Sequence, residues 1–568
     1  MANDTSSRKF LITSALPYAN GPLHFGHLAG VYLPADIYRR HRTLQGHRVV
    51  HICGSDEHGV AIMISAEKQN LSYKEYVDFW HQAHLKLFSR LQIEFDFFGK
   101  TSEPYHAEEV VEWFRALNAA GLIGKKSEKQ LFSVDDQKFL PDRYVEGTCY
   151  VCGYDSARGD ECPNCGEWID ATKLINPRSK ISGSTNLEIR ETEHYYLLLS
   201  KMEKTFREWF ATRKHWRPMV IGFVNGLLEQ GLVDRAISRD LNWGIPVPLP
   251  DASGKRFYVW FDAPIGYVSN LKEFLKRTGS KEHYLNDWWK ADNVEITHFI
   301  GKDNVVFHAV IWPCMILGSG RTNTPTELPA NHFVNLDGRQ FSKSAGWYLD
   351  TEKAIDLVGT DALRFYLCSI IPETNDTNFS TETFKTTYAE FANKIGNLVH
   401  RTLTFAKKNW PDGISGDHFT GAAIEAQIEK IQEYRNRYQD YMDSFQFLKA
   451  QNELLALAQA GNEFFHSSAP WKSAKTDQNE AARSTAVALA YTLAIGLMLL
   501  PIVPGTGSKI LQHFERSLNR DALLKAYTGQ ISDVVRSLHS SGFNSDLPLE
   551  ILVPRIEDET FEKIWEIT

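Results

Sequence analysis

Near the start of the chain an apolar strand runs through a polar loop into a helix, and this feature restricts the fold more than any other. Residues 9–13, KFLIT, have the composition of a buried strand, and GHLAGVYLPADIYRRHRTLQG carries apolar residues at helical spacing. A second strand, residues 49–53, runs into the polar loop GSDEHG. This alternation predicts an α/β, Rossmann-like parallel sheet whose loops bind ligands at the carboxyl ends of the strands.

The first loop places two histidines, His24 and His27, at the start of the helix. The first N–H groups of a helix have no partners and the helix dipole is positive there, which suits a phosphate. Both imidazoles can donate hydrogen bonds to phosphate oxygens, and Gly26 between them lets a flat ring approach the backbone. Two solvated histidines beside a turn are the alternative, because so short a motif also occurs by chance.

Four of the seven cysteines are bunched in CYVCGYDSARGDECPNC. The spacing C-x2-C-x9-C-x2-C lets four thiolates reach one tetrahedral Zn²⁺. A structural zinc site is therefore predicted at Cys149, Cys152, Cys162 and Cys165. Disulfides are the alternative, but nothing else in the sequence indicates an oxidising compartment.

Changes in residue composition and in the spacing of apolar residues divide the 568 residues into five parts. We expect the first half of the Rossmann domain in 1–117, a connective insertion with the cysteines in 118–230, and the second half of the domain in 231–325. Residues 326–380 form a linker that contains the loop QFSKS, and 381–568 have the apolar spacing of an α-helical bundle. The predicted architecture is thus a parallel sheet split by a zinc-binding insertion and followed by a bundle.

The formal net charge of −8 argues against a protein that coats nucleic acid, so a polynucleotide partner would need local basic patches. The uncharged stretch from Ser484 to Gly505 is long enough to span a bilayer, but polar residues interrupt it and prolines end it. We expect a buried helix of the bundle there, with no membrane partner. The N-terminus lacks the apolar core of a secretory signal, which favours a cytoplasmic location.

Several motifs occur together in one known family. HFGH at residues 24–27 and QFSKS at 340–344 resemble the histidine motif and the lysine loop of the class I aminoacyl-tRNA synthetases. Within that class ALPYANGPLHFGH, GSDEHG, YVWFDAPIGY, GKDNVVFH and the four-cysteine knuckle resemble the methionyl-tRNA synthetases. The resemblance runs from about residue 9 to beyond Trp471, most of the chain.

The resemblance implies a methionine–tRNA ligase, which activates L-methionine with ATP and Mg²⁺ and transfers it to tRNA. His24, His27 and Lys343 are then the catalytic residues. The implied ATP site consists of Gly26, His24, His27, Ser342, Lys343, Ser344 and Arg339. The implied methionine site consists of Ala15, Leu16, Tyr18, Asp56, Trp260, Ala263, Pro264, Tyr267 and His308. Asp56 would hold the substrate ammonium, and the aromatic edges suit a thioether.

Three positions depart from the pattern of the family. Its lysine loop begins with Lys and has Arg after the second Ser, but this chain has Gln340 and Ala345 there. Two cations are therefore missing, and we hypothesise that Arg339 supplies one of them. Asn304 stands where many relatives have an aliphatic residue near the pocket.

In the helical part, the resemblance implies an anticodon-binding domain. The matching residues are Asn393, Asn397, Arg401, Pro470 and Trp471. The expected partner is tRNA(Met), including the initiator tRNA, whose unpaired bases would be read by stacking and by hydrogen bonds. A tryptophan that fills the bundle core is the alternative. The chain ends at FEKIWEIT without a dimerisation domain, so we expect a monomer.

Three other interpretations explain part of the sequence. A small nucleotidyltransferase with an H-x-G-H motif would leave the helical part without a role. A zinc-containing nucleic-acid-binding protein without catalysis would show no ATP–pyrophosphate exchange. Another class I synthetase, for leucine, isoleucine or valine, would need a longer editing insertion than 118–230 allows, and a cysteine enzyme would place zinc at the amino-acid site.

Overall fold

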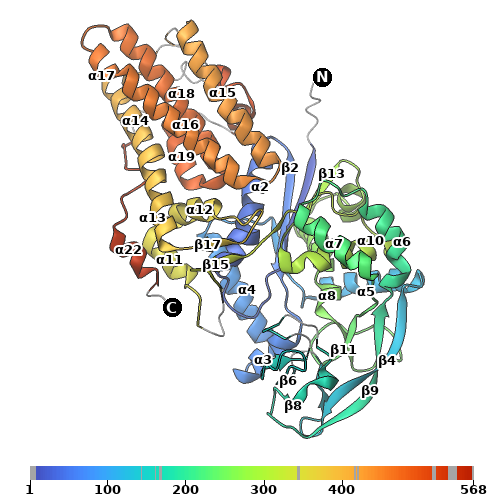
Figure 1. Cartoon of the computed structure of the whole chain (residues 1–568). Helices are drawn as coiled ribbons and strands as arrows, with labels where there is room; N and C mark the ends of the chain where they lie inside the picture. Colours follow the sequence, from blue (N-terminus) through green and yellow to red (C-terminus); the bar gives the residue numbers. More distant parts are fainter. Residues whose placement is uncertain are drawn as a thin grey trace.

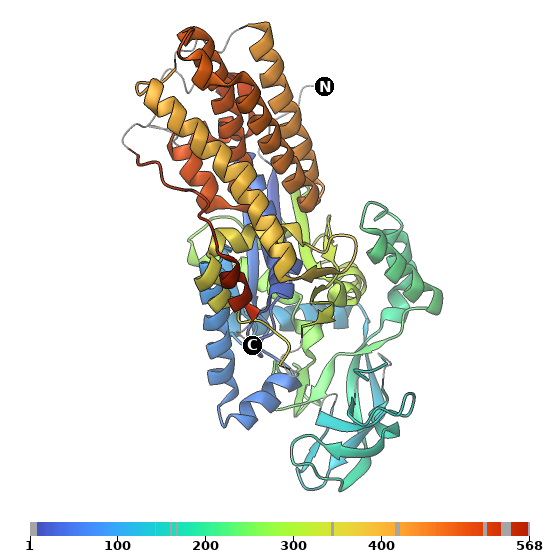
Figure 2. The same ribbon diagram turned by 60° about the vertical axis from the view of Figure 1, so that its left-hand side comes forward.

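The computed structural model describes residues 8–141, 144–159, 162–165, 169–341, 346–414, 418, 421–514, 520–534 and 547–565. Figure 1 shows a parallel sheet in the middle of the molecule, with the helical bundle at one end and the strand-rich insertion at the other. The view in Figure 2 shows the same separation.

The central sheet is parallel throughout and has five strands. In spatial order they are β14 (Ala330–Asn331), β13 (Val294–Gly301), β1 (Lys9–Ser14), β2 (Arg48–Ser55) and β3 (Phe97–Lys100). β1 to β3 precede the insertion and β13 and β14 follow it, so the prediction of a split Rossmann-like sheet is confirmed. The direction of the strand order reverses between β1 and β13, and sheets of this kind bind ligands at such a point.

Helices cover both faces of this sheet, which explains why β1 is buried beyond its first residue. The helical elements of the Rossmann domain are α1 (Phe25–His27), the π-helix η1 (Leu28–Tyr32), α2 (Leu33–Leu44), α3 (Val60–Lys68), α4 (Tyr73–Arg90), α5 (Pro104–Ala119), α8 (Val259–Asp262), α9 (Ile265–Arg277), the π-helix η4 (Tyr284–Trp289), the short 3-10 helix η5 (Lys302–Asn304), the π-helix η6 (Phe307–Ile311) and α10 (Trp312–Ser319). α4 begins where it does because Ser72 and Glu75 cap each other's backbone N–H groups.

The insertion between β3 and β13 is built on a long antiparallel pair, β4 with β9. Its elements are β4 (Ile123–Ser133), β5 (Lys138–Phe139), β6 (Val145–Thr148), β7 (Ala157–Arg158), η3 (Ala171–Lys173), β8 (Ile175–Ser179), β9 (Leu187–Leu197), α6 (Leu199–Phe210), α7 (Pro218–Gln230), β10 (Arg235–Ala236), β11 (Ser238–Asp240) and β12 (Lys255–Phe257). The sheet β7-β6-β8 carries the cysteines over a small core of its own. Buried residues of α6 and α7 belong to the main core.

A three-stranded sheet and two helices connect the Rossmann domain to the bundle. They are β15 (Val334–Leu336), β16 (Arg339–Gln340), α11 (Thr351–Val358), α12 (Thr360–Ser369) and β17 (Thr377–Phe379). The bundle consists of α13 (Thr381–Glu390), the π-helix η7 (Phe391–Gly396), α14 (Asn397–Asn409), α15 (Ala422–Asp443), α16 (Phe447–Ser468), α17 (Pro470–Ser473), α18 (Gln478–Ile502), α19 (Pro504–Gln512) and α20 (Arg520–Thr528). α22 (Asp558–Lys563) returns to pack on α11 and α13.

α18 contains most of the uncharged stretch that the sequence predicts to be a buried helix of the bundle. Within the described residues it alone is long and apolar enough to cross a membrane, and 94 % of its most apolar window is buried inside the protein. It packs against α14, α15, α16, α19 and α2. The prediction of a buried bundle helix is therefore confirmed.

Buried polar groups join the bundle to the Rossmann domain. The Arg364 side chain on α12 is fully buried and donates to Asp36 Oδ2 on α2 at 2.7 Å and to the Ile502 carbonyl at the end of α18 at 2.8 Å. Nearby, His41 on α2 is hydrogen-bonded through Nε2 to Asp443 Oδ1 at 2.7 Å. Each partner comes from a different part of the chain, so these contacts fix how the two domains meet.

Candidate active site

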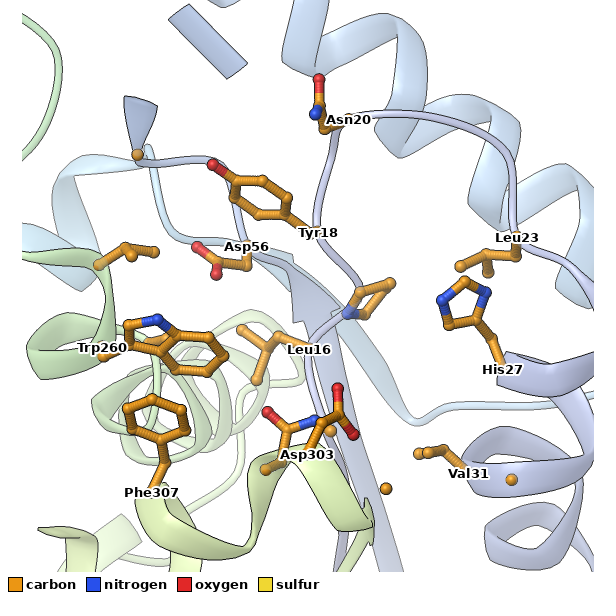
Figure 3. Close-up of a pocket in the computed structure, with 18 of the residues that line it drawn as sticks. Leu16, Tyr18, Asn20, Leu23, His27, Val31, Asp56, Trp260, Asp303 and Phe307 are labelled. Carbon is orange, nitrogen blue, oxygen red and sulfur yellow. The ribbon is translucent and has the colours of Figure 1, made fainter. Parts of the chain in front are cut away.

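A cavity of about 570 Å³ opens at the point where the strand order reverses. Its lining includes Leu16 and Tyr18 after β1, Asp56 after β2, and Gly301 and Asp303 at the end of β13. Figure 3 shows the Asp56 carboxylate beside the Tyr18 ring, with Trp260 and Phe307 below it and His27 on the far side. The polar loops that the sequence places at strand ends therefore meet in one space.

The two histidines of HFGH line this cavity, and the backbone fixes their rings. His24 Nδ1 accepts the Gly26 N–H at 3.1 Å, and His27 Nδ1 accepts the His24 N–H at 3.2 Å. A ring nitrogen that accepts carries no proton, so each neutral imidazole holds its proton on Nε2 and can donate from there. Each ring therefore presents its Nε2–H as a donor, and the role of these donors in phosphate binding stays a prediction.

The same rings are held by stacking. His24 and His27 stack with centroids 3.7 Å apart, and the Phe341 ring stacks on the other face of His24 at 4.5 Å. Gly26 also lines the cavity, and a Cβ atom there would come within 2.9 Å of the His24 ring. Only glycine leaves His24 in this orientation.

Asp56 is the buried carboxylate of the cavity. The loop that carries it is tied to the loop after β1, because its N–H donates to the Pro17 carbonyl at 2.9 Å and its carbonyl accepts the Ala19 N–H at 2.8 Å. Burial and the nearby Asp262 raise the pKa of Asp56 well above its usual value. Among the described residues Oδ1 has no hydrogen-bond partner. A buried acceptor without a partner is costly, and a cationic ligand would compensate for that cost.

Tyr267 and His308 form a polar pair in the wall. The His308 Nδ1–H donates to the Asn304 carbonyl at 3.1 Å, so Nε2 accepts from the Tyr267 hydroxyl at 2.8 Å. Burial lowers the pKa of His308 to about 4, which keeps this imidazole neutral at physiological pH. The pair offers a fixed hydroxyl and no charge.

Another part of the wall is apolar and aromatic. The Trp260 and Phe307 rings stack with centroids 3.7 Å apart and an interplanar angle of 4°. All nine residues that the resemblance assigns to methionine line the cavity: Ala15, Leu16, Tyr18, Asp56, Trp260, Ala263, Pro264, Tyr267 and His308. The structure thus brings the complete set together, over 294 positions of sequence from Ala15 to His308.

Several lining residues were not among the predicted ones. They include Asn20, Asp303, Phe307, Val334 and Phe341. Asn20 lies in ALPYANGPLHFGH, and Asp303 and Phe307 lie in GKDNVVFH, so the motifs themselves contained the signal. Asn304, the departure from the aliphatic residue of many relatives, also lines the cavity.

The lysine loop QFSKS is described only at its first two residues. Ser342, Lys343, Ser344 and Ala345 lie outside the described residues, whereas Gln340 and Phe341 before them line the cavity. Arg339 is exposed, and its guanidinium lies 5.4 Å from the Trp347 ring centroid. Arg339 is not among the described residues that line the cavity.

The four cysteines converge in the insertion. Their Sγ atoms lie within 4.8 Å of one another, with Cys149 and Cys165 at 4.0 Å and Cys152 and Cys162 at 3.6 Å. All four are free thiols, which disfavours the disulfide alternative. Sulfurs of a tetrahedral Zn²⁺ site, each about 2.3 Å from the metal, stand about 3.8 Å apart, so the cluster fits a zinc ion.

The predicted anticodon residues lie on the bundle, far from the cavity. Asn393 and Asn397 are exposed, in η7 and at the start of α14. Arg401 and Trp471 are half-buried, with the guanidinium 5.8 Å from the indole ring centroid, and Pro470 is buried. Trp471 also packs edge-on against Phe465 at 5.5 Å. Trp471 therefore fits both interpretations in part: it packs against the bundle core, and part of its ring stays accessible to a base.

Comparison with known proteins identifies the family. Residues 10–403 match the model "tRNA synthetases class I (M)", and residues 415–566 match the "Anticodon binding domain of methionyl tRNA ligase". The chain belongs to the methionyl-tRNA synthetase family. The resemblance stated from the motifs is confirmed, and so is the presence of a helical anticodon-binding domain at the end of a class I synthetase.

Relatives named methionine–tRNA ligase extend along the whole chain. The protein of Rubrobacter xylanophilus is 41% identical and the match covers 99% of this chain and 97% of the relative. That of Chlamydia pneumoniae is 43% identical, over 88% of this chain and 90% of the relative. The fold matches the Mycobacterium tuberculosis methionyl-tRNA synthetase in complex with methionyl-adenylate, with a TM-score of 0.76 and 22% identity over 96% of this chain and 100% of that one.

Proposed function

We propose that the cavity activates L-methionine with ATP and that the methionyl group then passes to tRNA(Met), as expected of a methionine–tRNA ligase. The observation that carries the proposal is the meeting of HFGH, GSDEHG, YVWFDAPIGY and GKDNVVFH around one cavity at the switch point of the sheet. In the first step the methionine carboxylate attacks the α-phosphate, and pyrophosphate leaves. In the second step the terminal ribose hydroxyl of tRNA attacks the adenylate carbonyl, and AMP leaves.

His24 and His27 supply electrostatic stabilisation. Both histidines line the cavity at the start of α1, so we expect their Nε2–H groups to donate to the triphosphate, where charge grows as pyrophosphate departs. Phosphoryl transfer depends mainly on positioning and charge stabilisation, so neither histidine has to act as a general base. Lys343, together with Ser342, Ser344 and Arg339, is proposed to add cationic and hydroxyl contacts, and Mg²⁺ bound to ATP would neutralise further charge.

Asp56 and the aromatic wall hold methionine. The carboxylate of Asp56 would bind the substrate ammonium, because it is buried and Oδ1 has no partner among the described residues. The edges of Trp260 and Tyr267 suit a polarisable sulfur, at about 0.3 to 1.5 kcal/mol for each contact. The neutral Tyr267–His308 pair would help reject an apolar side chain of the same shape.

We also propose that the four cysteines hold one structural Zn²⁺. The ion would supply four bonds that tie the ends of the knuckle together, and it would leave no open position for chemistry. Metal analysis of reduced protein should find about one zinc per chain, and Cys162→Ser should release it and unfold the insertion. Reduced wild-type protein without zinc would contradict the assignment.

The bundle is proposed to bind the CAU anticodon of tRNA(Met), in both elongator and initiator forms. Asn393 and Asn397 are exposed for hydrogen bonds, and Trp471 offers part of a ring for stacking beside Arg401. We further propose that the protein acts as a monomer in the cytoplasm, without a membrane partner.

ATP–pyrophosphate exchange across a panel of amino acids tests the proposed function. Exchange should depend on methionine far more than on leucine, isoleucine, valine or cysteine. Preference for one of these would indicate a sibling synthetase. Exchange with a cofactor precursor in place of an amino acid would indicate a nucleotidyltransferase, and no exchange at all would favour a non-catalytic zinc protein.

A further inference from the structure

His58 and Asp262 form a buried pair that joins two of the motifs around the cavity. His58 belongs to GSDEHG and Asp262 to YVWFDAPIGY, 204 positions away. His58 Nδ1 and Asp262 Oδ2 are 2.6 Å apart, and the two residues are 4% and 1% exposed. Neither is among the described residues that line the cavity, so the pair can act only through its neighbours.

Each partner adjoins residues that the proposed function uses. His58 stands two positions after Asp56, and its backbone N–H acts on the Asp56 carboxyl, lowering its pKa against the effect of burial. Asp262 directly precedes Ala263 and Pro264 and ends α8, the short helix that carries Trp260. The pair therefore connects the carboxylate that would bind the ammonium to the wall that would bind the side chain.

Other contacts make this connection rigid. Burial opposes ionisation of Asp262, but the imidazoles of His58 and His106 lower its pKa below the usual value. An ionised carboxylate only accepts, so the His58 Nδ1–H donates to it. His106 Nδ1 lies 2.9 Å from Ser269 Oγ on α9, and Trp243 Nε1 donates to the Glu57 carbonyl at 2.7 Å.

We infer that His58 and Asp262 are positioning residues that set the distance between Asp56 and the apolar wall, and through it the selectivity for side-chain length. The inference rests on the proposed methionine site. A substrate that is held at both its ammonium and the end of its side chain fits only if these two points are the right distance apart. Small displacements in an active site change rates strongly. Removing the His58 donor leaves the buried Asp262 carboxylate without this hydrogen bond, so we expect the two loops to move apart.

The experiment compares His58→Leu, which removes the donor, with His58→Asn, whose amide nitrogen can occupy the Nδ1 position. In ATP–pyrophosphate exchange, His58→Leu should raise the KM for methionine about 10-fold or more while the KM for ATP stays within about twofold. The ratio of kcat/KM for methionine to that for L-norvaline, whose side chain is one atom shorter, should fall severalfold. His58→Asn should restore most of both values, and Asp262→Asn should shift them in the direction of His58→Leu.

His41→Asn is the matched control, because His41 is also buried and bonded to a carboxylate, Asp443 Oδ1 at 2.7 Å, but lies at the joint to the bundle. It should lower thermal stability without changing the selectivity ratio.

If His58→Leu keeps a wild-type KM and ratio, or if it changes only stability as His41→Asn does, the inference is wrong. Should His58→Leu fail to fold, Asp262→Asn and His58→Asn decide the question by the same ratio. Failure of the proposed function would differ, since the wild-type protein would then show no methionine-dependent exchange.

Discussion

The cavity and the proposed anticodon face of the bundle differ in how far their residues are buried. In the cavity Asp56, Tyr267 and His308 are buried, and backbone or side-chain partners fix the rings of His24 and His27. On the bundle Asn393 and Asn397 are exposed. A site for small molecules is therefore built before its substrates arrive, whereas a site for a flexible RNA loop provides a scaffold that the RNA completes.

The two regions also use charge differently. The cavity carries a buried carboxylate whose ionisation burial opposes, so its charge depends on a bound cation. The proposed anticodon face has the Arg401 guanidinium beside the Trp471 ring, and any contact of that cation with phosphates would weaken with added salt. Substitutions in one region should thus leave the function of the other intact, and each of the following predictions tests that separation.

The largest effect is expected from His24→Asn. Asparagine keeps an acceptor for the Gly26 N–H, as a good N-cap residue, but removes the Nε2 donor. Loss of one preorganised donor should slow adenylate formation by about 100- to 1000-fold. Binding of tRNA, measured by filter retention, should not change. An adenylation rate within threefold of wild type would show that the imidazole does not stabilise the transition state.

Asp56→Asn should have the second-largest effect. It should weaken methionine binding but raise thermal stability. The ammonium loses a charged partner, so the KM for methionine should rise about 100-fold. The folded pKa of Asp56 lies above that of the unfolded chain, so its stabilising contribution is complete only below the unfolded pKa and is lost as pH rises through the folded pKa. Neutral pH lies above the unfolded pKa, so this contribution is reduced there and the variant should have the higher Tm.

The pH dependence of the wild type provides the control. The affinity for methionine should fall as pH decreases through the raised pKa of Asp56, because the protonated carboxyl no longer pairs with ammonium. In Asp56→Asn this decline should be absent. A variant less stable than wild type at neutral pH would contradict the assignment of Asp56 as a strained, ligand-dependent charge.

Trp471→Ala tests the other side of the comparison with a smaller effect. If a base stacks on the indole, recognition of tRNA should weaken by about 1 to 3 kcal/mol, while ATP–pyrophosphate exchange stays unchanged. Phe465→Leu is a suitable control, because Phe465 is 2% exposed and packs under the indole without reaching a base itself. A lower Tm together with unchanged aminoacylation would make Trp471 a core residue.

Arg339→Ala should give the smallest change. The side chain is exposed and lies over Trp347, so its charge would act on the phosphates through solvent and slow adenylation by about 3- to 5-fold. The affinity for methionine should stay the same. A wild-type adenylation rate, measured by quenched flow, would mean that Arg339 does not replace the cations missing at Gln340 and Ala345.

The sequence was sufficient to place the cavity because of how parallel sheets are connected. Loops after β1, β2 and β13 must meet at one edge, so motifs that follow these strands converge although Ala15 and His308 are far apart along the chain. The cysteine cluster was predictable for a local reason, since short spacings limit where four thiolates can point.

Side-chain partners that meet across elements could not be predicted. The stacking of Phe341 on His24, the stacking of Phe307 on Trp260 and the His58–Asp262 pair each depend on the final packing of distant segments. The same is true of the π-helical turns, which include η1 after HFGH, η6 with His308 and η7 with Asn393. An extra residue in a helical turn leaves no periodic signal in a sequence, yet it is often found at functional sites.

The buried Arg364 fixes the position of the bundle relative to the central sheet. Its guanidinium donates to Asp36 on α2 and to backbone carbonyls at the end of α18, and no part of the side chain reaches solvent. The bundle cannot tilt on the sheet without depriving this cation of its acceptors, which is expensive in a buried place. If the cavity and the bundle bind the two ends of one tRNA as proposed, their separation is fixed, and we expect an RNA whose anticodon and 3′ end stand at another spacing to contact only one of the two sites at a time.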